Sequence, residues 1–169
     1  MNHAELYDAR PWQTHYAHGT LANLAAPSAN SLAEMVRNAA NQFGLKTAFS
    51  LCLPDGTRAS LNFGQIDQLS DQFAQYLRGT LKLNQGDRVA VQMPNCLAYP
   101  IVSFGILKAG CILVNVNPLY TASEMHHQLN DSHAKVLVSI DVFGDKINDG
   151  LHDTPVEKVV LARIRDFFN

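Results

Sequence analysis

Short apolar runs alternate with helix-length segments throughout the second half of the chain, from Gly86 onward. The runs cover residues 88–93, 111–116, 135–140 and 156–162. The runs are apolar at successive positions, which is typical of strands that are buried on both faces. Each segment between two runs is long enough for a helix, and the last of these segments is expected to hold a short helix near 142–149. We therefore predict an α/β fold, with a mostly parallel sheet flanked by helices on both sides.

Capping signals mark where these helices begin. Asn95 is the expected cap of a mainly apolar helix that runs to about Ala109, and Thr121 with Glu124 forms a capping box for a helix that runs to about Ser132. The apolar stretch 97–116 contains polar residues and a turn signal, so we interpret it as a buried helix followed by a buried strand and not as a membrane span.

The first half has a different pattern. Residues 1–30 show no sustained period and are expected to form an irregular arm that wraps onto the domain. Ser31 caps an amphipathic helix that ends near Gly44, a turn at 55–56 joins an early β-hairpin, and Asn62 caps the next helix. We thus predict an arm (1–30) and an α/β domain (31–169), the latter with a helix-hairpin-helix part (31–84) and a βαβ part (85–169).

Composition narrows the function classes. The 169 residues carry 13 Lys+Arg and 15 Asp+Glu, a net charge of −2, and 47% of them are hydrophobic. A chain without a basic surplus is unsuited to a primary role in nucleic-acid binding, and so apolar a chain is not a disordered acidic tail. The amino terminus lacks the basic and apolar regions of a signal peptide, which favours a cytoplasmic location. Cys52, Cys96 and Cys111 form no C-x-x-C pair, so we expect buried free thiols.

Motifs for the commoner catalytic sites are absent from the sequence. Gly105 and Gly110 have the G-x-x-x-x-G spacing, but Cys111 replaces the phosphate-loop lysine, and no G-x-G-x-x-G fingerprint occurs. His126 and His127 would point about 100° apart on a helix, so we expect no metal site there or with the more distant His133. Cys96 follows a helix cap, where a thiol pKa can fall, but no base can be assigned to it, which favours a structural thiol.

Four segments together do match a family pattern. The chain resembles the amino-terminal region of bacterial long-chain fatty acid–CoA ligases, which belong to the adenylate-forming, acyl-activating superfamily. The general superfamily elements are LNFGQI (61–66) and LKAG (107–110), and the segments that point to the long-chain ligases are NPLYT (117–121) and QLNDS (128–132). The resemblance runs from about Ser31 to the end of the sequence. Turn and capping chemistry also explains these residues without any function.

The family's catalytic motifs do not occur in these 169 residues. They are a Ser/Thr/Gly-rich loop for the ATP phosphates, an acidic residue for the ribose, a glutamate for magnesium and a lysine on a mobile carboxy-terminal domain. Enzymes of this family are also roughly three to four times longer than one domain of this size. We therefore interpret the sequence as an amino-terminal part of a ligase, with no catalytic residue of its own, and expect the 169 residues alone to be inactive and to need no cofactor.

The resemblance implies what the whole enzyme would do. It would use ATP and Mg²⁺ to convert a long-chain fatty acid into an acyl-adenylate, and would then transfer the acyl group to coenzyme A. In related synthetases the loop after the second strand and a basic residue after the third approach the nucleotide end of coenzyme A. The corresponding positions here are Asn117, Pro118, Leu119 and Lys146. A long-chain substrate would also fit peripheral contact with the inner membrane, although the sequence has no basic amphipathic anchor.

Two alternatives remain open at this stage. The βαβ pattern alone is compatible with a stand-alone α/β module that binds a nucleotide or a protein. An open sheet edge with uncovered apolar faces could instead serve as an assembly surface for a homo-oligomer.

Overall fold

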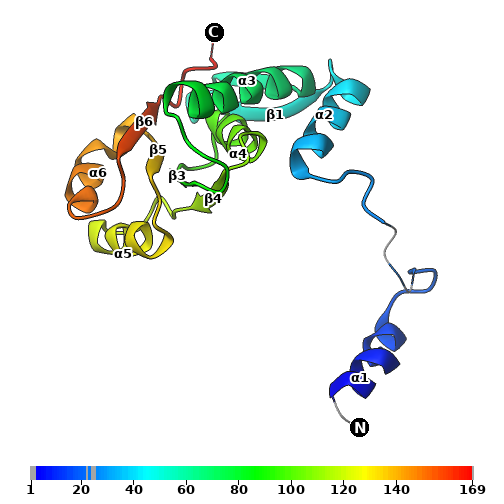
Figure 1. Ribbon diagram of the computed structural model, residues 1–169. Helices are drawn as coiled ribbons and strands as arrows, with labels where there is room; N and C mark the ends of the chain where they lie inside the picture. The colour runs from blue at the N-terminus through cyan, green and yellow to red at the C-terminus, as the bar shows by residue number, and fades with distance from the viewer. Residues whose placement is uncertain (1–2, 22, 24–25, 169) are drawn as a thin grey trace.

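A four-stranded parallel sheet forms the centre of the computed structural model, which describes residues 3–21, 23 and 26–168 (Figure 1). The strand order is β4-β3-β5-β6, and all three neighbouring pairs are parallel. The strands are β3 (Arg88–Gln92), β4 (Ile112–Asn115), β5 (Val136–Ile140) and β6 (Lys158–Ala162). The chain therefore places its second parallel strand on one side of the first, and its third and fourth strands on the other.

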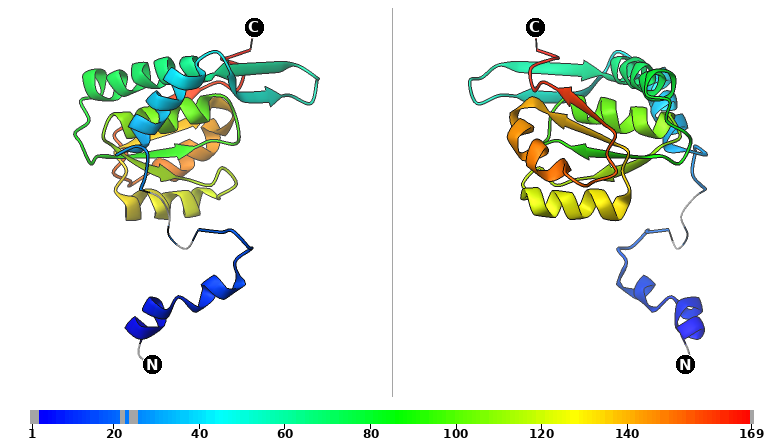
Figure 2. Two further views of the ribbon diagram at one scale, coloured as in Figure 1. Left: turned by 90° about the vertical axis from the view of Figure 1, so that its right-hand side faces the viewer. Right: turned by 60° about the vertical axis from the view of Figure 1, so that its left-hand side comes forward.

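Helices cover both faces of this sheet, as predicted (Figure 2). Val89 and Val91 of β3 pack with α4 (Ala98–Lys108), which α3 (Phe63–Gln75) covers in turn. Ala90 faces the opposite way and packs with α5 (Ala122–Ser132) and α6 (Gly144–Leu151), the latter preceded by the short helix η3 (Asp141–Phe143). Because both faces of the sheet are covered, the central strands carry apolar side chains on both faces.

The predicted elements of the first half are also present. Ser31 caps α2 (Leu32–Phe43), and its side chain accepts a hydrogen bond from Glu34 N. Strands β1 (Thr47–Cys52) and β2 (Arg58–Asn62) form the antiparallel hairpin. Both halves of the capping box are made at Asn62 and at Thr121, and α3 continues into η2 (Tyr76–Thr80).

The expectation that residues 1–30 are irregular needs correction for residues 3–15, whereas the described residues from 16 to 30 form no helix or strand. Two short helices, α1 (His3–Ala9) and η1 (Pro11–His15), lie in the segment expected to be irregular. Figures 1 and 2 show both helices away from the α/β domain and not wrapped onto it. Residues 1–2, 22 and 24–25 of the predicted arm lie outside the described residues.

Three further predictions need correction. Asn95 does not cap α4, because the helix begins at Ala98 and its N-cap is Leu97, which makes no side-chain capping bond. Cys52 is exposed, whereas Cys96 and Cys111 are buried as expected. The run at 111–116 is not a buried strand, because β4 lies at the sheet edge and Ile112 is 48% exposed.

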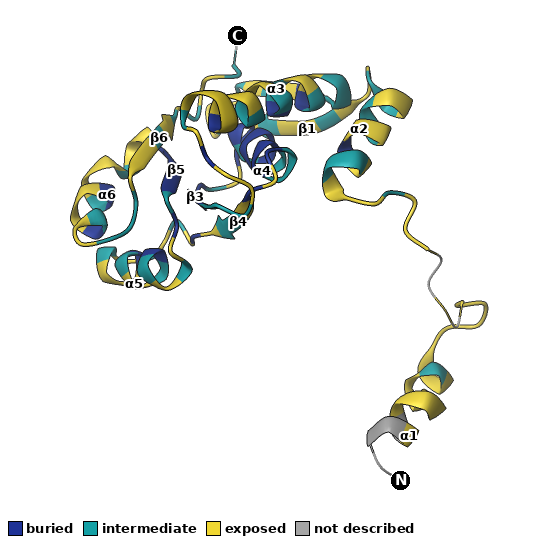
Figure 3. Ribbon diagram, viewed as in Figure 1, coloured by how far each residue is buried: buried dark blue, intermediate teal, exposed yellow. Residues whose placement is uncertain are grey.

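The core follows the two central strands. Figure 3 shows burial concentrated in β3, β5 and α4, with exposed positions along β6. All five residues of β5 are buried, whereas Val159 and Leu161 of β6 are 39% and 53% exposed. No helix in the described part of the chain is long and apolar enough to cross a membrane.

Candidate functional site

A candidate site lies at the carboxyl edge of the parallel sheet. A pocket of about 420 Å³ opens there between the ends of β3 and β4 and the start of α4. Open parallel α/β sheets bind ligands at this edge, because the loops after the strands meet there. The lining residues are uncharged: Val91, Met93, Asn95, Tyr99, Asn115, Val116, Asn117, Pro118 and Tyr120.

Hydrogen bonds from two helices fix the polar wall of this pocket. The Tyr99 hydroxyl of α4 donates to Asn115 Oδ1 at 2.9 Å, and Gln128 Nε2 of α5 donates to the Asn115 carbonyl at 2.8 Å. Val116 N donates to Val91 O at 2.9 Å and so extends the β3–β4 pairing past the end of β4. The wall therefore presents amide and phenol groups in fixed positions, which suits a polar uncharged group of a ligand better than a polyphosphate.

The structure brings together the loop and the lysine that the resemblance singled out. Asn117 Oδ1 accepts a hydrogen bond from Leu119 N at 3.0 Å, and this turn holds Pro118 beside the pocket. Lys146 Nζ donates to Pro118 O at 3.2 Å and lies 5.5 Å from the centre of the Phe143 ring. Asn117 and Pro118 line the pocket, whereas Leu119 is 84% exposed. Lys146 does not line the pocket and contacts the loop through the Pro118 carbonyl.

A second polar feature lies where the strand order reverses, between β3 and β5. Gln92 and Ser139 are fully buried neighbours on these strands. The Ser139 hydroxyl contacts Gln92 O at 3.0 Å and Gln92 Oε1 at 3.2 Å, but Gln92 Nε2 has no hydrogen-bond partner among the described residues. The switch point is thus filled by side chains, and the open pocket lies one strand away on the β4 side.

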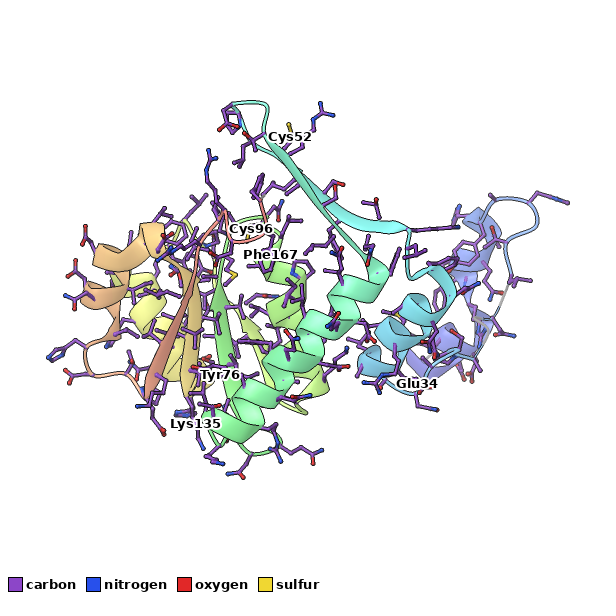
Figure 4. All side chains as sticks on the ribbon, turned by 90° about the horizontal axis from the view of Figure 1, so that it is seen from above. Glu34, Cys52, Tyr76, Cys96, Lys135 and Phe167 are labelled. Carbon is purple, nitrogen blue, oxygen red and sulfur yellow. The ribbon has the colours of Figure 1, made fainter. Side chains whose placement is uncertain are left out.

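Cys96 has the environment of a structural thiol. Burial raises its pKa, and this outweighs the backbone hydrogen bonds from Tyr99 and Ala98 that act in the opposite direction. Cys96 belongs to a buried cluster against which Phe167 packs, while Cys52 lies on the hairpin (Figure 4). A raised pKa leaves less thiolate at neutral pH, so the expected loss of nucleophilicity agrees with the structural interpretation.

The lysine of the LKAG segment also has a structural role. The Lys108 side chain is 3% exposed, and its ammonium lies 2.6 Å from Asp67 Oδ1 and 2.9 Å from Asp71 Oδ1. It also donates to the Asp67 carbonyl at 2.9 Å, so that the end of α4 is tied to the middle of α3. This lysine is saturated with acceptors and is not available to a ligand.

Histidines do not gather into a metal centre in the part of the chain that the structure describes, where no group of three or more His, Cys, Asp or Glu side chains could hold an ion. His126 Nε2 contacts the Asn130 amide at 3.2 Å, and His127 is exposed. His133 follows the end of α5 as its C-cap, with φ 51°. The helix therefore ends before His133, where the chain changes direction.

Sequence reasoning identified the loop of this site but not its wall. Asn95, Tyr99, Asn115 and Tyr120 were not expected to line a pocket. Their positions in the sequence could have indicated this role. Each of them lies at the end of a predicted parallel strand, directly after one, or near the start of the helix that follows one, and such positions meet at the carboxyl edge of the sheet.

The sheet order and the helices on both faces define a doubly wound parallel α/β domain. A model of the family described as AMP-binding enzyme matches residues 36–166, and the chain belongs to this family. It is 38% identical over 155 residues to a long-chain-fatty-acid–CoA ligase of Salmonella typhimurium, covering 92% of this chain and 27% of that protein. It is 47% identical over 106 residues to the Escherichia coli O157:H7 protein of the same name, covering 63% and 19%.

A solved structure supports the same assignment. The crystal structure of a long-chain-fatty-acid–CoA ligase from Archaeoglobus fulgidus superposes with a TM-score of 0.74 at 28% identity, over 83% of this chain and 28% of the other. The resemblance to the amino-terminal part of such ligases is therefore confirmed. Some of these curated relatives match more than 90% of this chain, but the chain spans only about a quarter of their length.

Proposed function

We propose that this chain is the amino-terminal domain of a long-chain fatty acid–CoA ligase. The whole protein would join a fatty acid to AMP from ATP, with release of pyrophosphate, and would then pass the acyl group to the thiol of coenzyme A with release of AMP. The observation that carries this proposal is the match of 155 residues at 38% identity to a protein of that name. ATP would react as its Mg²⁺ complex, as nucleotides generally do in such transfers.

The 169 residues alone are proposed to be inactive. The described pocket has no charged lining residue, and Lys146, the nearest expected cation, is already bound to the Pro118 carbonyl. Transfer reactions of this kind depend on positioned cations and backbone donors around the developing charge. Formation of oleoyl-CoA from oleate, ATP, Mg²⁺ and coenzyme A by the purified chain, followed by mass spectrometry, would contradict this proposal.

The loop 117–119 and Lys146 are proposed to meet the nucleotide end of coenzyme A. Their contact across 28 residues of sequence supports a common role, since Lys146 holds the loop that borders the pocket. Titration with coenzyme A alone, followed by chemical-shift changes, tests this directly. We expect shifts at Asn117 and Leu119 that weaken in Lys146→Ala.

A matched control is available for that variant. Lys46 Nζ lies 4.9 Å from the centre of the Phe43 ring, the same type of contact that Lys146 makes with Phe143. Lys46→Ala removes an equivalent charge and ring contact away from the pocket and is expected to leave the titration unchanged. Equal effects of the two variants would indicate nonspecific attraction of the anionic ligand and remove the proposed site.

Cellular placement belongs to the same proposal. We place the whole ligase in the cytoplasm, with peripheral contact with the inner membrane, because its fatty-acid substrate partitions into lipid. Co-sedimentation of the native protein with phospholipid vesicles tests this contact. Complete recovery in the supernatant at low ionic strength would contradict it.

A further inference from the structure

Asn115 carries an oriented amide donor at the wall of the pocket. Its carbonyl accepts a hydrogen bond from Gln128 Nε2 at 2.8 Å, and its Oδ1 accepts one from the Tyr99 hydroxyl at 2.9 Å. Its backbone lies in register with Val91 of β3. Asn115 Nδ2, in contrast, has no hydrogen-bond partner in the part of the chain that the structure describes. Asn115 is exposed and lines the pocket, so a ligand can reach this amide.

The Tyr99 hydroxyl determines which way the Asn115 amide faces. Because this hydroxyl donates to Oδ1, the amide oxygen lies toward Tyr99, and the planar amide group holds Nδ2 on its other side. Without this hydrogen bond the oxygen and the nitrogen could exchange places by rotation about χ2, a torsion with a broad, roughly two-fold preference. Tyr99 is therefore suited to act as a positioning residue for Asn115.

Asn117 provides a second amide of the same kind. Its Oδ1 accepts a hydrogen bond from Leu119 N at 3.0 Å, and its carbonyl accepts one from Tyr120 N at 3.1 Å. Its Nδ2 has no hydrogen-bond partner among the described residues. The wall thus carries two amide donors whose own oxygen atoms are already engaged. The apolar lining residues of the pocket are Val91, Met93, Val116 and Pro118.

We propose that Tyr99 orients Asn115 so that Asn115 Nδ2 donates to an amide carbonyl of the pantetheine arm of coenzyme A. This inference rests on the proposed function, in which the nucleotide end of coenzyme A meets the loop 117–119 and Lys146. Coenzyme A joins a phosphorylated, negatively charged nucleotide to a neutral arm with two amide groups. The pocket has no charged lining residue, so it can pair the carbonyls of the arm but cannot compensate the charge of the phosphates.

Titration of the ¹⁵N-labelled chain with pantetheine, followed by NMR, tests this inference. Pantetheine is neutral and lacks the nucleotide, so nonspecific attraction of an anion does not contribute. We expect shifts of the Asn115 side-chain amide signals on binding. Asn115→Asp keeps the size of the side chain and the acceptor for Tyr99 but removes Nδ2, and it should weaken pantetheine binding about tenfold.

Tyr99→Phe tests the positioning role. It removes the hydroxyl but keeps the ring, and it should move the Asn115 amide signals in the free protein and weaken pantetheine binding by about twofold or more, because only the correctly oriented amide binds. Binding of adenosine 3′,5′-bisphosphate, the nucleotide end without the arm, should not change. Tyr120→Phe is the matched control, since it removes a hydroxyl from the same pocket that has no hydrogen-bond partner among the described residues.

The outcomes separate this inference from the proposed function. If adenosine 3′,5′-bisphosphate shifts Asn117 and Leu119 but pantetheine leaves the Asn115 amide unmoved, the nucleotide contact stands and the inference is overturned. Equal losses of pantetheine binding in Tyr99→Phe and Tyr120→Phe would also overturn it, because the orientation of Asn115 would then not matter. If neither coenzyme A nor either of its parts causes shifts, the proposed coenzyme site is wrong, and this inference is wrong with it.

Discussion

Helices α3 and α4 approach each other closely at Gly105 of α4, and this contact gives a sharp test of the packing. A Cβ atom at this position would lie 2.8 Å from Phe73 Cδ1, 3.0 Å from Phe73 Cβ and 3.0 Å from Ser70 O. Phe73 can rotate, but the Ser70 carbonyl belongs to the backbone of α3. An added methyl group therefore has to push the two helices apart.

Two effects of Gly105→Ala oppose each other. Overpacking of a close helix contact costs about 1–3 kcal/mol. Alanine in place of glycine within a helix contributes about 0.5–1 kcal/mol in the stabilising direction. The steric term is larger, so we expect the free energy of unfolding to fall by about 1–2 kcal/mol, which lowers Tm by roughly 2–4 °C per kcal/mol in a domain of this size.

Urea denaturation followed by far-UV circular dichroism measures this change. All samples need the same protein concentration, because self-association would make the apparent stability concentration-dependent. Gly79→Ala is the control, since no atom lies within 4 Å of its added Cβ and only the helix preference remains. A Gly105→Ala variant as stable as the native chain would refute the argument that backbone contact between α3 and α4 requires glycine.

Three further predictions concern polar and charged side chains. Lys108→Met should lower the free energy of unfolding by about 2 kcal/mol, because it leaves the partly exposed carboxylates of Asp67 and Asp71 without their shared cation. The double variant Lys108→Met/Asp67→Asn should recover part of this loss in the same urea assay. If Lys108→Met causes no loss, the ion pair does not tie α4 to α3. Gln92→Met removes an amide nitrogen without a partner and should be neutral or stabilising by about 1 kcal/mol, whereas marked destabilisation would reveal an unseen partner for Nε2. The Lys135 ammonium lowers the pKa of Asp87 below its ordinary value of 3.8, so the stability from this pair is present above that pH and is lost as the pH falls through the lowered pKa. The urea midpoint should therefore fall more steeply below about pH 4 for the native chain than for Asp87→Asn. Parallel pH curves for the two proteins would contradict this prediction.

The local rules of the sequence predicted most of the fold because they depend on neighbouring residues. The capping boxes at Asn62 and Thr121 formed as expected, since each needs only a residue three positions away. Asn95 failed as a cap because the apolar residues after it are drawn into the core, and α4 begins only at Ala98. The pocket could be predicted only in part, because Tyr99 and Asn115 meet through the crossover from α4 to β4 and not through sequence proximity.

Burial of the strands shows most clearly what a sequence pattern does not contain. The apolar runs in β4 and β6 predicted buried strands just as the run in β5 did, yet of these three strands β5 alone has a neighbour on each side. An apolar run indicates that a strand is stable when its side chains are buried, but the order of strands in the sheet decides whether the described residues bury them. For β6 they do not, and Val159 and Leu161 therefore remain 39% and 53% exposed among the described residues.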